Sequence, residues 1–500
     1  MTRSRFVGNT VSLAVATAVS TVLTLAQMRI LAAYLPLALF GLFASLRGLS
    51  LLVSILAANG FPQALVRFLP EHAARGQRGV AVRASVVAVT ATLGAGAIML
   101  VAMFALRTVF FRHVPAQELS APLFLWFSVT TLAVALKLVL YGGFNGLRRF
   151  GSQTMLETLA LAVQVVWMWH ARGSLDLLHL FEIVGITSAV SALVAVPWYS
   201  ARLTSDVRSG APQPATVSYR SYWAGAVALS VVALAFSDVD RWVLSNVLAL
   251  DVLSLFHVAS RVSRLANRFI AVPVLTLQPE ITRIRAEGRG DEVDVVTSAF
   301  FKASLMMGAF AAAAIVACAN ALIEIASGRQ FLGAHTTLII MAASIPLAAM
   351  TAPLTAVMKA LDGVRAAFYC DLAWACVYIV LMLLCASSLG LVGTGWAQLA
   401  ASSAQFAIAM RLATVRPSVG DAFGALARSV LCAAVAFAPA WWLFRAHVNI
   451  AFAVMALVAA TPLFVGLARR VHILSDTERE RVRAVLARRG VGPALMWFVP

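Results

Sequence analysis

Three arginines interrupt a long apolar stretch of this sequence. Residues 261–269 read RVSRLANRF, between WVLSNVLALDVLSLFHVAS and IAVPVLTLQP. Arg261, Arg264 and Arg268 follow i, i+3, i+7 spacing, so they share one face if the stretch is a helix. A guanidinium group keeps its charge and binds phosphate through two parallel hydrogen bonds. The pattern therefore indicates a phosphate-binding face within an apolar segment.

The composition indicates that this segment lies in a lipid bilayer. Of the 500 residues, 61% are hydrophobic and only 12% are charged, whereas about a quarter of the residues in soluble domains are charged. A chain with so much apolar surface cannot hide it from water. We therefore expect an all-α integral membrane protein.

Runs of about 20 apolar residues predict the spans, because a helix of that length crosses the hydrocarbon core. The fourteen predicted spans are 8–28, 38–60, 84–106, 119–142, 154–170, 177–200, 220–237, 246–278, 296–320, 332–358, 366–386, 390–410, 422–444 and 449–468. The long polar stretch 201–219 falls between the sixth and seventh spans and resembles a joint between two halves.

The distribution of lysine and arginine predicts the orientation. With the N-terminus inside, most of these residues fall in the inward loops, and cytoplasmic loops are the ones enriched in them. We expect both termini in the cytoplasm. The net charge of +18 then reflects topology and attraction to anionic lipid headgroups. The basic residues do not gather on one face with aromatic residues, which argues against nucleic-acid binding.

The arginines within spans have two interpretations. A charge at the bilayer centre costs about 2.5–3.5 kcal/mol on insertion scales, and a water-filled cavity would avoid most of that cost. Alternatively, the span ends before Arg261, the arginines anchor its cytoplasmic end, and FIAVPVLTLQ (269–278) lies at the interface.

An internal repeat favours the cavity. Arg29 and Arg47 in the first half recur as Arg241 and Arg261 in the second, and a Pro-Glu step follows each pair. Two repeats in the same orientation are typical of two parallel six-helix lobes. We expect pseudo-symmetric lobes around a central cavity, with Arg47 facing Arg261 across it, and two extra helices after them. The predicted parts are an N-terminal lobe (1–205), a cytoplasmic linker (206–219), a C-terminal lobe (220–415), the last two spans (416–470) and a cytoplasmic tail (471–500).

Four acidic residues within or beside spans are candidates for binding a coupling ion: Glu157, Asp238, Asp240 and Asp371. Each could instead form an ion pair with the arginines. Asp238 and Asp240 are the strongest pair, because two neighbouring carboxylates raise the pKa of one of them. In an extended segment both would point the same way.

The C-terminal tail predicts a short helix. SDTERERVRAVLARRG (475–490) begins with Ser475 and has Glu478 three residues later, which is a capping box. Val482, Val485 and Leu486 form a narrow apolar stripe. We expect this helix to rest on the cytoplasmic membrane surface, with docking to a partner protein as the alternative.

Three stretches carry a resemblance to a known family. They are RILAAYLPLALFGLFASLRGLSLLVSILAANGFPQALVRFLPE (29–71), YGGFNGLRRFGSQTMLETLA (141–160) and SDVDRWVLSNVLALDVLSLFHVASRVSRLANRFIAVPVLTLQPEITR (237–283). With the span plan, they resemble the Wzx-type O-antigen and exopolysaccharide flippases of the multidrug/oligosaccharidyl-lipid/polysaccharide (MOP) superfamily.

This resemblance implies two six-helix lobes in a V, a cationic cavity and alternating access in a bacterial plasma (inner) membrane. It implies an undecaprenyl-diphosphate-linked oligosaccharide as substrate, a proton or sodium ion for coupling, and membrane lipids and polysaccharide polymerase machinery as partners. By position, Arg29, Arg47 and the Arg261 face would contact the diphosphate. The complete predicted diphosphate site is Arg29, Arg47, Arg241, Arg261, Arg264 and Arg268.

Two other functions compete with a flippase. A multidrug or cation antiporter of the same superfamily would need acidic groups in its cavity, whereas the deep charge here is mainly basic. A membrane polymerase or transferase would need a compact catalytic site, and the sequence has no Ser-His-Asp or metal-ligand constellation. We expect a non-enzymatic protein without cofactors or metal.

Overall fold

The structure is a computed structural model that describes most of the chain. The described residues are 3–74, 76–111, 114, 120–147, 149–206, 227–228, 232, 239–286, 291–361, 364–444, 450–474 and 478–480. The regular elements within these ranges are all helices. Eight of the described helices are long and apolar enough to cross a membrane, which agrees with an all-α integral membrane protein.

Every predicted span that the structure describes overlaps a helix, although several ends differ, and residues 246–249 of the eighth span are not helical. The exception is the predicted seventh span, 220–237, most of which lies outside the described residues together with nearly all of the predicted linker 206–219. The fourteen-span plan therefore stays a prediction. The chain divides into two compact units, one of residues 9–254 and one of residues 1–8 and 255–500.

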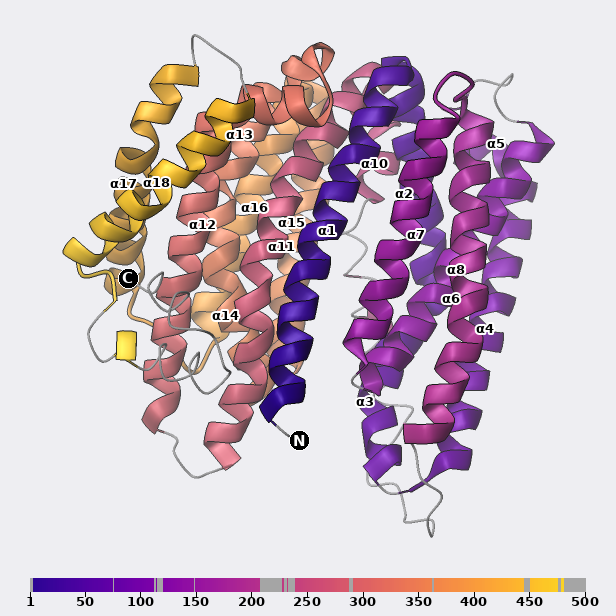
Figure 1. Cartoon of the computed structure of the whole chain (residues 1–500), viewed down its shortest axis with the longest axis horizontal. Coiled ribbons are helices and arrows are strands. Elements are labelled where there is room, and N and C mark those ends of the chain that lie inside the picture. The colour runs from indigo at the N-terminus through magenta and orange to yellow at the C-terminus, as the bar shows by residue number, and fades with distance from the viewer. Residues whose placement is uncertain are drawn as a thin grey trace. The chain divides into compact units, whose positions relative to one another are not determined.

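The unit of residues 9–254 is built around one central helix. Its helices are α1 (Arg3–Tyr34), α2 (Leu37–Ala58), α3 (Phe61–Ala74), α4 (Arg78–Ala105), α5 (Arg107–Phe110), α6 (Ala121–Gly146), α7 (Phe150–His170), α8 (Leu177–Asp206) and α10 (Val239–Leu244). α6 packs against α2, α3, α4, α7 and α8, and Figure 1 shows these long helices running side by side. Ser120 caps α6 by accepting a hydrogen bond from the Leu123 amide at 3.3 Å, which satisfies a donor of the first turn.

The sequence NGFP (59–62) follows the last residue of α2. Asn59 adopts a left-handed conformation (φ 46°) and Gly60 follows at φ 76°, which asparagine and glycine tolerate best. Pro62 then lies in the first turn of α3, where its missing amide hydrogen costs nothing.

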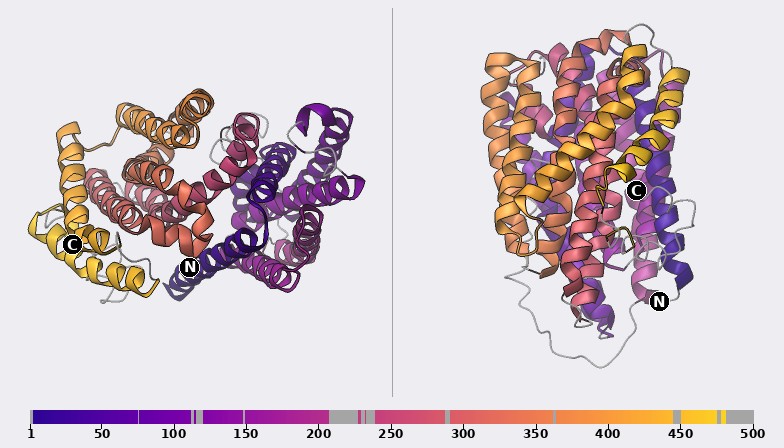
Figure 2. Two further views of the ribbon diagram at one scale, coloured as in Figure 1. Left: turned by 90° about the horizontal axis from the view of Figure 1, so that it is seen from above. Right: turned by 90° about the vertical axis from the view of Figure 1, so that its left-hand side faces the viewer.

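The unit of residues 255–500 contains the remaining helices. They are α11 (Leu250–Ala286), which begins in the other unit, α12 (Asp291–Ala326), the 3₁₀ helix η1 (Arg329–Ala334), α13 (His335–Ala343), α14 (Ile345–Leu361), α15 (Val364–Leu389), α16 (Leu391–Leu412), α17 (Val419–Phe444) and α18 (Ile450–Arg470). α12 packs against α13, α14, α17 and α18, and α15 packs along α16. Figure 2 shows these helices end-on.

Candidate functional site

α11 presents two of the predicted arginines on one face. Arg261 and Arg264 are partly buried, and His257, one turn earlier, is buried. Since α11 begins at Leu250, Arg261 lies about 17 Å along its axis, a distance comparable to half of the hydrocarbon core. Arg268 belongs to the same helix, but its side chain lies outside the described residues.

α11 continues without interruption past these arginines. It is helical through residues 269–278 and ends at Ala286, so that stretch is not a separate interfacial segment. Leu277 and Ile281 pack in a core with Phe300 of α12 and Val357 of α14. The continuous helix shows that these arginines lie within α11 and not at its end.

Arg29 and Arg47 are two of the predicted diphosphate-site residues of the first unit. Arg29 on α1 is exposed, and Arg47 on α2 is partly buried between the buried residues Leu46 and Gly48. Arg47 and Arg261 belong to different units, so their facing across a cleft stays a prediction.

Arg241 is placed differently from the other predicted site residues. Its side chain is 0% exposed, and that of Asp240 is 4% exposed. Their helix α10 packs against α2, where Ser45 donates to Ser245 at 3.0 Å. The Trp242 indole of α10 also donates a hydrogen bond to the carbonyl oxygen of Phe110, the last residue of α5, at 3.3 Å. Arg241 therefore has no access to solvent in this structure.

The structure describes only one member of the Asp238–Asp240 pair. Asp240 lies in the first turn of α10, which begins at Val239, and Asp238 lies outside the described residues. Coupling-ion binding at this pair therefore stays a prediction.

Glu157 lies beside basic and hydroxyl side chains in the first unit. It is exposed on α7 and lies within electrostatic range of Lys137 and Tyr141, both on α6. Lys137 also lies within electrostatic range of Arg47. Lys137 was not among the site residues predicted from the sequence.

A buried amide network lies on the same face of α7. Gln164 donates to Thr187 of α8 at 2.8 Å and accepts from Gln27 of α1 at 3.3 Å. All three side chains are buried. The network connects three helices and makes the inner face of α7 polar.

Asp371 on α15 is the predicted acid of the second unit. Its side chain is partly buried and accepts a hydrogen bond from Gln405 of α16 at 3.1 Å. One carboxylate oxygen thus has an amide donor from the neighbouring helix. Within the described ranges, no three His, Cys, Asp or Glu residues are grouped to hold a metal ion.

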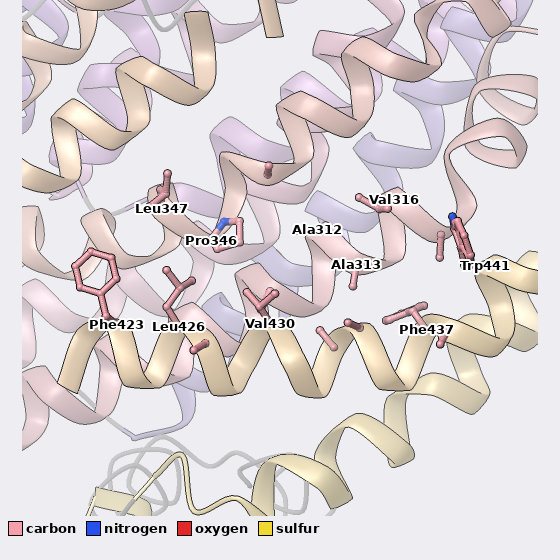
Figure 3. A pocket seen from close by; sticks show the side chains of 17 residues that line it. Ala312, Ala313, Val316, Pro346, Leu347, Phe423, Leu426, Val430, Phe437 and Trp441 are labelled. Atoms are coloured by element: carbon pink, nitrogen blue, oxygen red, sulfur yellow. The ribbon is translucent and has the colours of Figure 1, made fainter. Parts of the chain in front are cut away.

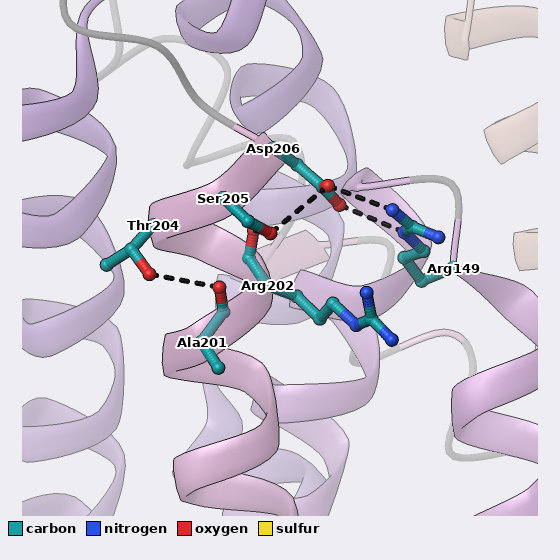
Figure 4. Close-up of polar contacts among 6 residues, drawn as sticks. All are labelled: Arg149, Ala201, Arg202, Thr204, Ser205 and Asp206. Atoms are coloured by element: carbon teal, nitrogen blue, oxygen red, sulfur yellow. Dashed lines mark hydrogen bonds and ion pairs between the residues drawn. The ribbon is translucent and has the colours of Figure 1, made fainter.

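An ion pair joins two segments of the first unit. The Arg149 guanidinium donates to both carboxylate oxygens of Asp206, through Nε and Nη2, at 2.9 Å each (Figure 4). This bidentate contact joins the α6–α7 connection to the last residue of α8. The hydrogen bond to Asp206 raises the pKa of Arg149.

An apolar groove of about 760 Å³ lies within the second unit. Figure 3 shows side chains of α17, including Phe423, Val430 and Phe437, on one side of it, with Ala313 of α12 and Pro346 of α14 on the other. Its seventeen lining residues are all apolar. The groove can hold a hydrocarbon chain but offers no charged partner.

The sequence profile of the family described as "Polysaccharide biosynthesis protein" matches residues 6–285, which is more than half of the chain. The chain belongs to this polysaccharide biosynthesis protein family. The matched range includes Arg29, Arg47, Lys137, Glu157 and the arginines of α11. A search of curated protein sequences finds no match.

Solved structures show the fold that this family member adopts. The lipid II flippase MurJ in an inward closed conformation is 13% identical, with a TM-score of 0.66 over 92% of this chain and 98% of that one. An inward-facing multidrug resistance MATE family transporter of the MOP superfamily is 13% identical, with a TM-score of 0.63 over 79% and 95%.

A MOP superfamily transporter from Pyrococcus furiosus, described as having a binding pocket of reverse polarity, is also 13% identical, with a TM-score of 0.58 over 84% and 98%. The polysaccharide biosynthesis protein therefore has the MOP superfamily fold. These findings confirm the resemblance that was stated from the sequence.

Proposed function

We propose that this protein is a flippase that moves an undecaprenyl-diphosphate-linked oligosaccharide across the bacterial plasma membrane for surface polysaccharide biosynthesis. The observation that carries the proposal is the set of guanidinium groups on long helices, namely Arg47 on α2, which is apolar and long enough to cross a membrane, and Arg261 and Arg264 on α11. A guanidinium group binds phosphate bidentately, through two parallel hydrogen bonds. Such groups at membrane depth are therefore suited to binding a diphosphate.

The polysaccharide biosynthesis family supports a sugar substrate, and the fold shared with the lipid II flippase MurJ supports transport of a lipid-linked one. Arginines distributed over α1, α2 and α11 would each make a few contacts as the protein alternates between inward and outward exposure. Distributed contacts also limit the affinity, so that the substrate can leave on the other side.

The topology and the coupling belong to the same proposal. Fourteen spans, two six-helix lobes and cytoplasmic termini would place Arg47 and Arg261 on opposite walls of one cavity. Asp371, partly buried and bonded to Gln405, is the candidate for a coupling proton or sodium ion in the second unit. The apolar groove between α12, α14 and α17 is suited to the hydrocarbon chain of the substrate.

Deleting the gene and identifying the lipid-linked sugars by mass spectrometry tests the proposal. We expect one lipid-diphosphate oligosaccharide to accumulate in the inner leaflet, and surface polysaccharide to disappear. An oligosaccharide that accumulates unpolymerised in the outer leaflet would instead indicate a polymerase. Normal surface polysaccharide with lost drug resistance would indicate a cation antiporter.

A further inference from the structure

α7 has an apolar face and a polar face, and Glu157 lies on the polar face. The exposed apolar residues Met155, Leu159, Val163 and Val166 recur at three- and four-residue spacing, as expected of a lipid-facing stripe. Glu157 follows Met155 by two positions, so it points about 200° around the helix from it. Its exposure is therefore on the side opposite the lipid-facing stripe.

A buried polar residue lies on the same face as Glu157. Gln164, two turns further on, is bonded to Gln27 and Thr187 inside the unit. The exposed carboxylate thus lies on the same helix face as a buried amide network and away from the lipid-facing stripe. A soluble anion or a lipid headgroup could reach it there.

α6 supplies the cation that faces Glu157. Lys137 is partly buried, lies within electrostatic range of both Glu157 and Arg47, and sits one turn before Tyr141 on the same helix face. Because α6 ends at Gly146 and α7 begins at Phe150, Lys137 and Glu157 lie about 14 Å and about 10 Å from that end of the unit. The two charges are thus at similar depth.

Two buried hydroxyls lie beside this cluster. Tyr141 on α6 and Ser191 on α8 are neighbours, 6% and 7% exposed, and their hydroxyls interact with each other but make no other hydrogen bond within the described part of the chain. Because a hydroxyl can donate and accept at once, the member of this pair that accepts keeps its own proton for an acceptor that enters the site.

We infer that Arg47, Lys137, Tyr141 and Glu157 form a phosphoryl-binding site inside the unit of residues 9–254, in which Glu157 is the internal counter-ion that the incoming phosphate displaces. This inference rests on the proposed function for the source of the phosphate. Lys137 and Arg47 supply two positive charges, and the hydroxyl pair supplies a neutral donor. Glu157 balances Lys137 while the site is empty and repels the bound phosphate, which promotes release.

The two charges on α6 and α7 have opposite effects in this site. Replacing Lys137 by glutamine removes an attractive charge and should weaken phosphate binding roughly tenfold or more, since charge-assisted hydrogen bonds contribute at least that much. Replacing Glu157 by glutamine removes a repulsive charge and should tighten binding severalfold. Lys137→Arg keeps the charge and should retain most of the affinity.

The test measures binding to the full-length protein in phosphatidylcholine nanodiscs by calorimetry. The probes are inorganic pyrophosphate and farnesyl diphosphate, which separate a free phosphate from a lipid-borne one. Arg172→Gln and Asp176→Asn are matched controls, because both residues are exposed charges of the same unit in the α7–α8 connection. We expect both controls to bind like the wild-type protein.

Either probe supports the site if its affinity falls in Lys137→Gln and rises in Glu157→Gln. A response of farnesyl diphosphate alone identifies the lipid-borne phosphate as the ligand. Affinities for both probes that are the same in Lys137→Gln, Glu157→Gln and wild type overturn the site. Weaker binding of either probe by Glu157→Gln also overturns the site, and this result can be obtained even if Lys137→Gln fails to fold. Either result leaves the proposed function standing, because that is judged from the accumulated lipid-linked sugar.

Discussion

Lys302 on α12 donates through its ammonium group to both carboxylate oxygens of Glu478, at 2.9 Å each. Ser298, one turn earlier on α12, donates to the same carboxylate at 2.6 Å. Glu478 is only 7% exposed. The C-terminal segment therefore contacts a helix of its own unit at this residue. Apart from residues 478–480, the predicted tail helix (475–490) lies outside the described residues, so its position on the membrane surface stays a prediction.

Removing the ammonium group should destabilise the second unit. Lys302→Met leaves a buried carboxylate with only part of its hydrogen bonding, which costs about 1–3 kcal/mol. Thermal unfolding of the detergent-solubilised protein measures the loss. The double variant Lys302→Met/Glu478→Gln should recover part of it, and a melting temperature of the single variant equal to that of the wild type would show that the contact contributes nothing.

The Arg149–Asp206 pair should contribute far less. Its side chains are 41% and 24% exposed, and exposed ion pairs contribute at most about 1 kcal/mol. We expect Arg149→Ala to lower stability by that amount or less, with a smaller effect at high salt because exposed charges are screened. A loss several times larger at any ionic strength would mean that Arg149 has a second role.

Gly142 on α6 should tolerate no side chain. A Cβ atom there would lie 2.6 Å from the Cα and carbonyl oxygen of Pro62 at the start of α3, and backbone atoms cannot move aside. Gly142→Ala should cost about 1–3 kcal/mol. Gly151→Ala on α7 is the matched control, because a Cβ there meets nothing within 4 Å, and it should be neutral or stabilising. Equal melting temperatures for the two variants would contradict the close α3–α6 packing.

Charge reversal tests the proposed cationic cavity. Arg47→Glu and Arg261→Glu place a negative charge where the diphosphate should bind, so each should abolish complementation of the gene deletion. Membrane insertion should remain normal, because each variant exchanges one charged side chain for another and leaves the apolar residues of its helix unchanged. Surface polysaccharide and membrane abundance are measured together. Full export by both correctly inserted variants would rule out this cavity.

Replacement of Asp371 tests the coupling ion. Asp371→Asn keeps the size of the side chain and the bond from Gln405 but cannot carry a charge. We expect export that depends on an ion gradient to be lost, while binding of farnesyl diphosphate stays unchanged. If gradient-driven export persisted in reconstituted vesicles, the coupling ion would have to bind elsewhere.

The sequence by itself determined the features that depend on local pattern. Apolar runs place the helices, since each run must bury its length in the bilayer, and NGFP ends α2 because asparagine and glycine accept a left-handed backbone. The spacing of Arg261 and Arg264 puts both on one helix face, because helical periodicity is a property of the chain alone.

Only the tertiary structure decided which charged groups are accessible and what they contact. Arg241 and Arg47 look alike in sequence, yet one is completely buried and the other partly exposed, because burial depends on neighbouring helices. The Lys302–Glu478 contact joins residues 176 positions apart, and no periodic pattern encodes such a distance. The proximity of Lys137 to Glu157 likewise arises from the packing of α6 against α7.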